Sequence, residues 1–244
     1  MYNTILVSLK INFKSLRMSA LNYIMLVIIF PFSYLAIALT SSDNALPTII
    51  KVSGAVMSML FSLFINMQAT LVSNSNNITI RETYAVYGVK PVIVFISQCL
   101  FHTILSLPII LSAVIVLVFS LDSFSIISFS IWFILSILFL STISLLLGMS
   151  LKNPQIASPC INLTYMILIS VTPLYNPLNS IDAFYLWNPL THIINLFYSA
   201  FGSNYIFCDT LLSVMILVGC ICVSIFFILH QKKKLYGNEK LTIL

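Results

Sequence analysis

Six long apolar runs without a single Asp, Glu, Lys or Arg constrain this sequence more than any other feature. They cover residues 21–40, 52–72, 92–120, 126–148, 156–171 and 211–230. About 20 apolar residues cross a bilayer as a helix. Only 7% of the residues are charged, against about 25% in soluble domains. With a mean hydropathy of +1.08, the chain predicts an all-α integral membrane protein with six transmembrane helices.

The distribution of basic residues predicts the orientation of the chain in the membrane. If the N-terminus is cytoplasmic, ten of the eleven Lys and Arg residues fall in cytoplasmic segments, and only Lys51 lies outside. Both termini, including the tail at 231–244, are then cytoplasmic. The net charge of +5 therefore faces anionic lipid, and no basic polar domain favours nucleic acid as a partner.

Residues 1–20 carry two adjacent stripes at helical spacing, one apolar and one basic. The stripes are Leu6, Leu9, Phe13 and Leu16, and Lys10, Lys14 and Arg17. This pattern predicts an amphipathic helix that lies in the cytoplasmic interface before the first span. The alternative is an ordinary basic flank without regular structure.

The predicted spans offer little for ion coupling or catalysis. His102 is the one ionisable candidate for proton coupling, and we expect it to be hydrogen-bonded within the bundle. The sequence contains no HExxH, GxSxG or GxxxxGK[ST] motif, so we predict no catalytic residue, metal site or nucleotide site in this chain. The five cysteines form no CxxC pair, and we interpret them as small core residues. Any ATP that drives the protein is therefore bound by another chain.

Residues 79–90 predict a short capped helix between the second and third spans. Thr79 and Glu82 fit a capping box, Gly88 suits a left-handed C-terminal position, and Pro91 prevents continuation. The spacing puts three apolar residues on one side: Ile80, Tyr84 and Tyr87. So short a helix needs something to pack on. Local physics leaves the membrane surface and a cytoplasmic partner equally open.

Three stretches in a fixed order carry a family resemblance. They are the N-terminal interfacial helix, the loop Ile80-Arg-Glu-Thr-Tyr-Ala-Val-Tyr-Gly-Val-Lys-Pro91, and Trp187-Asn188-Pro189-Leu190-Thr191 after a proline-containing turn. Together they resemble the ABC-2 type permeases, the six-span membrane subunits of ATP-binding-cassette exporters. The resemblance covers essentially residues 1–244 as a single transmembrane domain. The chain departs from the family pattern at Thr79, where a second acid is common, and lacks an Arg between His192 and Tyr205.

The resemblance implies two sets of site residues. A coupling helix at 79–90 would sit in a groove of an ATPase subunit, with contributions from Thr79, Arg81, Glu82, Tyr84, Tyr87, Gly88 and Pro91. An extracellular segment at 174–207 would form short re-entrant helices, marked by Pro173, Pro177, Trp187, Asn188, Pro189 and Thr191. Two six-span subunits, identical or related, would form the pathway in the lipid bilayer. The chain itself would need no cofactor, because ATP and Mg would be bound by the ATPase.

The function implied is permease of an ATP-driven exporter in the cytoplasmic membrane of a bacterium. The uncharged spans and short outer loops favour an amphipathic or lipophilic cargo, such as an antimicrobial peptide, a toxin or a drug. A stand-alone membrane protein that confers immunity by binding a toxin is the main alternative. A polysaccharide exporter and a secondary transporter are further alternatives, and the uncharged membrane interior counts against the second of these.

Overall fold

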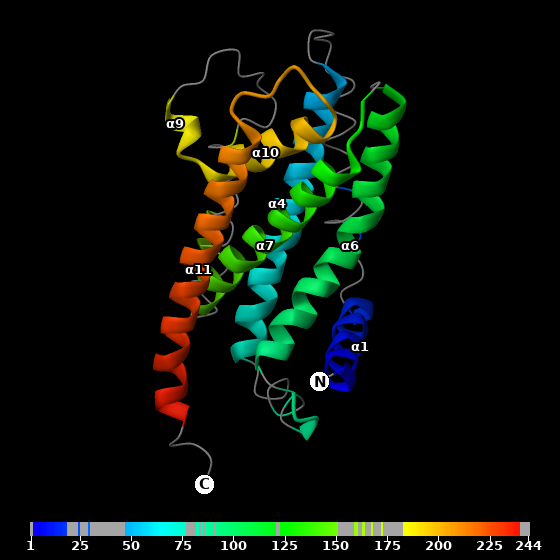
Figure 1. Ribbon diagram of the computed structural model, residues 1–244. Helices are drawn as coiled ribbons and strands as arrows, with labels where there is room; N and C mark the ends of the chain where they lie inside the picture. The colour runs from blue at the N-terminus through cyan, green and yellow to red at the C-terminus, as the bar shows by residue number, and fades with distance from the viewer. Residues whose placement is uncertain are drawn as a thin grey trace.

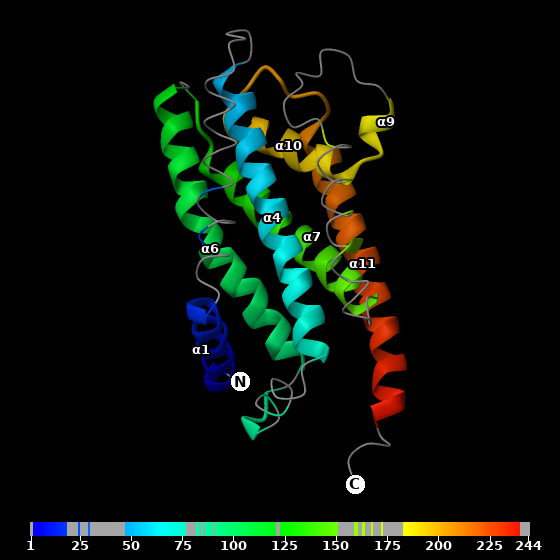
Figure 2. The same cartoon turned by 180° about the vertical axis from the view of Figure 1, so that it is seen from behind.

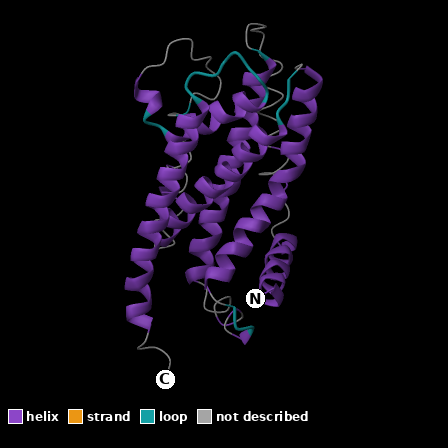
Figure 3. Ribbon diagram, in the orientation of Figure 1, coloured by secondary structure: helices purple, strands orange, loops and turns teal. Residues whose placement is uncertain are grey.

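The computed structural model of the chain describes residues 2–18, 24, 29, 47–76, 82, 84, 86–89, 91–120, 123–150, 159, 160, 163, 167, 172 and 183–239. Over these residues the chain forms helices and loops, with no strand (Figure 3). Almost all of the predicted spans 21–40 and 156–171 lies outside the described residues. The prediction of an all-α fold therefore holds for the described part, and the six-span count stays a prediction.

The described part contains seven helices. They are α1 (Tyr2–Met18), α4 (Thr48–Asn76), α6 (Pro91–Ser120), α7 (Ile126–Ser150), α9 (Ala183–Leu186), α10 (Pro189–Ala200) and α11 (Thr210–Glu239). Four of them, α4, α6, α7 and α11, cover predicted apolar runs. Among the described residues, three stretches are long and apolar enough to cross a membrane: Val92–Phe119, Ile126–Gly148 and Thr210–His230. α4 contains the predicted span at 52–72, and its described residues Thr48–Phe64 form an apolar stretch.

The helices pack as a bundle that is crossed at one end by α10. α4 lies against both α6 and α7, and α11 packs on α7. α10 lies across the bundle against α7, α11 and α4, while α1 lies alongside α6 near the opposite end (Figures 1 and 2). We call these the α10 end and the α1 end. The turn at 82–89 and the last turns of α11 are at the α1 end (Figure 1). That this end is cytoplasmic stays a prediction.

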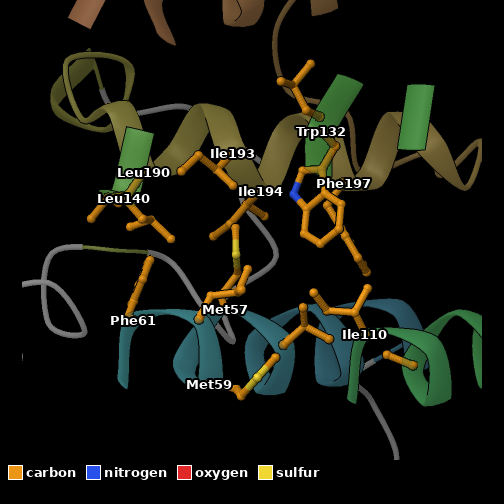
Figure 4. Packing of buried hydrophobic residues seen from close by; sticks show 14 of the residues in the cluster. Met57, Met59, Phe61, Ile110, Trp132, Leu140, Leu190, Ile193, Ile194 and Phe197 are labelled. Atoms are coloured by element: carbon orange, nitrogen blue, oxygen red, sulfur yellow. The ribbon is translucent and has the colours of Figure 1, made fainter. Parts of the chain in front are cut away.

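Apolar side chains of α4, α6, α7 and α10 share one core (Figure 4). α4 is buried all round from Ile49 to Phe64, as expected for a helix surrounded by other helices. Trp132 of α7 meets Phe197 of α10 edge to face, with ring centroids 4.9 Å apart. The Ser144 hydroxyl donates to the Phe64 carbonyl at 2.8 Å and ties α7 to α4. Because lipid tails are themselves apolar, such close packing and hydrogen bonds stabilise the bundle more than burial does.

A tight junction joins the start of α7 to the end of α10. The Ser125 amide donates to the Ala200 carbonyl at 2.8 Å, and the Ser123 hydroxyl donates to the Phe201 carbonyl at 3.0 Å. Gly202 follows with a φ of +56°, a left-handed conformation that glycine adopts without strain. A Cβ at position 202 would lie 3.0 Å from the Ser123 Cβ and closer still to its hydroxyl. This junction holds the end of α10 beside the start of α7.

We therefore expect Gly202→Ala to destabilise the α10 end by about 1–3 kcal/mol, through backbone strain and the clash with Ser123. The measurement is thermal unfolding of the purified chain in detergent. Gly219→Ala is the matched control, because Gly219 is helical and a Cβ there meets nothing within 4 Å. Equal melting temperatures for the two variants would contradict the prediction.

Candidate functional site

The turn before α6 presents exposed side chains at the α1 end. Glu82 is exposed, and Val86 and Tyr87 are 83% and 56% exposed. The Val89 amide donates to the Tyr84 carbonyl at 2.9 Å, and Gly88 has a φ of +61°. The predicted left-handed conformation of Gly88 is thus confirmed.

The structure does not describe the first residues of the predicted coupling helix. Thr79, Ile80 and Arg81 lie outside the described residues, so the capping box stays a prediction. Pro91 is the first residue of α6, where a proline needs no amide hydrogen bond.

Tyr84 packs inward, unlike Tyr87. Its side chain is 8% exposed and forms a small apolar cluster with Val89 and Ile93. Ile5 and Ile11 of α1 and Val94 of α6 pack against this cluster. The prediction that Tyr84 and Tyr87 share one face is therefore wrong, because α1 offers Tyr84 an apolar surface that the sequence spacing alone does not reveal.

The Tyr84 hydroxyl is buried near the α1 helix. Burial raises the pKa of Tyr84 above its usual value of 10.0, and the nearby Ser8 hydroxyl partly opposes this effect. No group among the described residues makes a well-formed hydrogen bond to the Tyr84 hydroxyl. The ring therefore holds the turn against α1 mainly by apolar packing.

A line of polar contacts joins α1 to α6 beside this cluster. The Ser8 and Ser97 hydroxyls lie 2.5 Å apart, and the Gln98 amide donates to the Asn12 side chain at 2.9 Å. Phe13 packs edge-on against Phe101, with ring centroids 5.0 Å apart. The predicted N-terminal helix exists, and polar residues on it face the bundle. Its position in the membrane interface stays a prediction.

The stretch Trp187–Thr191 begins α10 at the other end of the molecule. Asn188 is the N-cap, with its side-chain oxygen accepting from the Leu190 amide at 3.1 Å, and Pro189 takes the first helical position. Trp187 is 86% exposed, whereas Thr191 is fully buried. Pro173 and Pro177 lie outside the described residues, and the re-entrant depth of this segment stays a prediction.

A buried polar cluster, which the sequence analysis did not identify, fastens α10 to the loop before α11. The Asn195 side-chain amide donates to the Cys208 carbonyl and to the Ser213 hydroxyl, both at 2.9 Å. Its oxygen accepts from the Phe207 amide at 3.0 Å. The Asn195 side chain therefore forms hydrogen bonds both to Ser213 of α11 and to Phe207 and Cys208 of the preceding loop. The only sequence signal is the presence of Asn195 and Ser213 in apolar surroundings.

His192 completes this cluster in a defined tautomer. Its Nε2 lies 2.9 Å from the Leu186 carbonyl, and its Nδ1 lies 3.1 Å from the Ser213 hydroxyl. Because a carbonyl only accepts, Nε2 carries the proton and Nδ1 accepts from Ser213. Burial raises the pKa of the neighbouring Cys208 thiol, which keeps the sulfur protonated and argues against a nucleophilic role.

His102 lies between the rings of Phe64 and Phe101 inside the bundle, with centroids 6.5 and 5.3 Å from its own. Its Nδ1 lies 2.9 Å from the Gln98 carbonyl, which agrees with the expectation of a hydrogen bond within the bundle. Its Nε2 has no hydrogen-bond partner in the described part of the chain. A proton relay needs a successive acceptor, and this contact with the helix's own backbone does not provide one.

The contacts of the described residues connect the turn 82–89 to the helices of the bundle. No group of three His, Cys, Asp or Glu residues that could hold a metal occurs among them. The described cysteines form no disulfide. The exposed turn 82–89 is joined through Tyr84 to α1 and α6, and α6 packs on the central α4. The turn is thus connected through packed side chains to the central helix α4.

We expect Asn195→Ala to lower the free energy of unfolding by about 1–3 kcal/mol, because it leaves the Phe207 amide and the Cys208 carbonyl without the Asn195 side chain and removes one of the partners of the buried Ser213 hydroxyl. Thermal unfolding in detergent measures the effect. Asn204→Ala, at an exposed position of the same loop, is the control and should leave stability unchanged. A loss no larger for Asn195→Ala than for Asn204→Ala would contradict the assigned role.

Comparison with known proteins identifies the family of this chain. The family model described as ABC-2 type transporter matches residues 2–202, which include every described helix except α11. No curated protein matches the chain. The family match extends over most of the sequence and agrees with the apolar helices at 92–119 and 126–148. The chain therefore belongs to the ABC-2 type transporter family, a membrane component of transport that normally pairs with an ATPase.

Proposed function

We propose that the chain is the permease subunit of an ATP-driven exporter and that a separate ATPase binds the turn 82–89. The proposal rests on a difference in exposure among the side chains of this turn. Glu82, Val86 and Tyr87 are exposed at the α1 end, while Tyr84 is anchored to α1 and α6. An exposed apolar residue beside a charge suits a protein partner, and a buried anchor suits the transmission of force.

The contacts suggest a path for that force. Closure of two ATPases around ATP would push the turn toward the bundle, and the Tyr84 cluster would pass the movement to α1 and α6. The Ser8–Ser97 and Asn12–Gln98 contacts would make α1 and α6 move together. α6 packs on α4, so the displacement would reach the central helix as a rigid-body shift.

The remaining parts of the proposal concern assembly and cargo. ATP and Mg would be bound by the ATPase, and two permease subunits would enclose the pathway in a bacterial cytoplasmic membrane. No Asp, Glu, Lys or Arg occurs in residues 92–120, 126–148 and 211–230. A pathway lined by such helices favours an amphipathic or lipophilic cargo, such as an antimicrobial peptide, toxin or drug, over a highly charged one.

The turn should crosslink to the ATPase. The chain is co-expressed with a candidate partner ATPase, and a photoreactive phenylalanine analogue replaces Val86. Because Val86 is 83% exposed in the turn, we expect an ATP-dependent covalent product with the ATPase. The matched control carries the same analogue at Trp187, which is 86% exposed at the α10 end.

Two variants extend this test. Glu82→Arg and Val86→Asp should each weaken ATPase recovery about tenfold or more, since both change the centre of the contact. Crosslinking from position 187 but not from 86, or full recovery with both variants, would rule out the turn as the docking site. A stand-alone immunity protein would then become the better reading.

The Tyr84 ring should matter for transmission more than its hydroxyl does. Tyr84→Phe keeps the packing against α1, so we expect ATPase stimulation by the permease to be retained. Tyr84→Ala removes the packing and should lower stimulation while ATPase recovery through Val86 and Tyr87 persists. Reconstituted ATPase activity and co-purification are measured together. A Tyr84→Ala variant that stimulates normally would contradict the transmission role.

A further inference from the structure

Pro108 lies in the interior of α6. Because a proline has no amide hydrogen, it cannot donate the helical hydrogen bond to the carbonyl four residues earlier, at Ile104. The proline ring also presses on that carbonyl, and a helix bends at such a position. Figures 1 and 2 show that α6 changes direction part-way along its length. The backbone of α6 is therefore weakened at one defined turn.

Two hydroxyl groups act on the same stretch of α6. The Thr103 hydroxyl donates to the Cys99 carbonyl at 2.8 Å, and the Ser106 hydroxyl donates to the Thr103 carbonyl at 2.8 Å. Hydroxyls that bond back to carbonyls of their own helix compete with the backbone hydrogen bonds and bend the helix. Between Cys99 and Pro108, one backbone hydrogen bond is missing and two carbonyls are shared. Bending here therefore costs less free energy than in an uninterrupted helix.

The part of α6 before Pro108 is attached to α1 and to the turn 82–89. Ser97, Gln98 and Phe101 contact side chains of α1. Ile93 belongs to the small apolar cluster around Tyr84. These contacts all precede the weakened turn, so α1 and the first part of α6 form one packed unit.

The part of α6 after Pro108 is attached to the core instead. One face of it is buried in the core that α6 shares with α4, α7 and α10, namely Ile110, Ala113 and Leu117. The opposite face is open, with Ile115 and Phe119 56% and 88% exposed. The two parts of α6 are thus held by different neighbours, and the weakened turn lies between them.

We propose that residues 103–108 form a hinge, about which the first part of α6 tilts together with α1 while the later part stays in the core. At 1.5 Å per residue the first part is about 25 Å long, so a tilt of about 20° would move Pro91 by about 9 Å. The role of this tilt in coupling rests on the proposed function, because the turn 82–89 precedes Pro91. The hinge itself is a property of the permease alone.

Distances between two spin labels on the purified chain in nanodiscs test the hinge without an ATPase. One pair joins the exposed positions Val92 and Leu229 toward the α1 end, and the other joins the exposed positions Ile115 and Met215 toward the α10 end. The labels are carried by a non-natural amino acid, so the native cysteines stay in place. We expect the Val92–Leu229 distances to spread over about 5–10 Å and the second pair to give a narrower distribution.

Pro108→Ala restores the missing amide donor. It should narrow the Val92–Leu229 distribution about twofold and leave the Ile115–Met215 distribution unchanged. Ser130→Ala is the matched control, because the Ser130 hydroxyl makes the same kind of bond, to the Ile126 carbonyl at 2.7 Å, in a helix without proline. It should leave both distributions unchanged.

A Val92–Leu229 distribution as wide in Pro108→Ala as in the wild type overturns the hinge, even where an ATPase binds the turn as proposed. Conversely, failure of an ATPase to bind the turn leaves a narrowing by Pro108→Ala as evidence for the hinge. If Pro108→Ala does not fold, Thr103→Val takes its place, because it removes one of the two bonds from a hydroxyl to the helix backbone. An unchanged Val92–Leu229 width in Thr103→Val then overturns the hinge, and a narrower one supports it.

Discussion

In a bilayer the backbone has no water to bond with, and the rest of this structure depends on that constraint. Each apolar run must satisfy its own amides and carbonyls, which makes it a helix. Once helical, the runs gain little from further burial in an apolar solvent. What holds them in one arrangement is therefore close packing, such as Trp132 on Phe197, and a small number of buried hydrogen bonds. The bond from Ser144 to the Phe64 carbonyl is one of these.

The contacts that fasten α10 at one end of the bundle and the turn 82–89 at the other differ in kind. At the α10 end, Asn195 and His192 each make several hydrogen bonds at once, so α10, the following loop and α11 are fastened firmly. At the α1 end, Tyr84 holds the turn by apolar packing. Packing of this kind allows a small shift of the turn more readily than a saturated hydrogen-bond cluster does. A firm α10 end and a more compliant α1 end would suit the proposed permease, which would be driven from the α1 end.

Local sequence rules worked where a residue's conformation depends on its immediate neighbours. Gly88 adopts the expected left-handed conformation, and the three apolar stretches of α6, α7 and α11 occur where the runs predict them. The rules failed for Tyr84, since helical spacing cannot tell which neighbour covers a side chain. Asn195 and Ser213 were missed for a related reason. They are 18 residues apart, and only the fold brings them within hydrogen-bond distance.

The sequence by itself determined that the chain is a membrane protein and that its described part is helical, because both follow from composition. It also determined the left-handed conformation of Gly88, which follows from short-range sterics. Only the tertiary structure decided that Tyr84 faces α1 while Val86 and Tyr87 face outward. It also decided that the Lys51 side chain, near the start of α4, is buried. Burial and pairing depend on which distant segments meet, and in an apolar solvent that choice depends on a few specific contacts rather than on hydrophobicity.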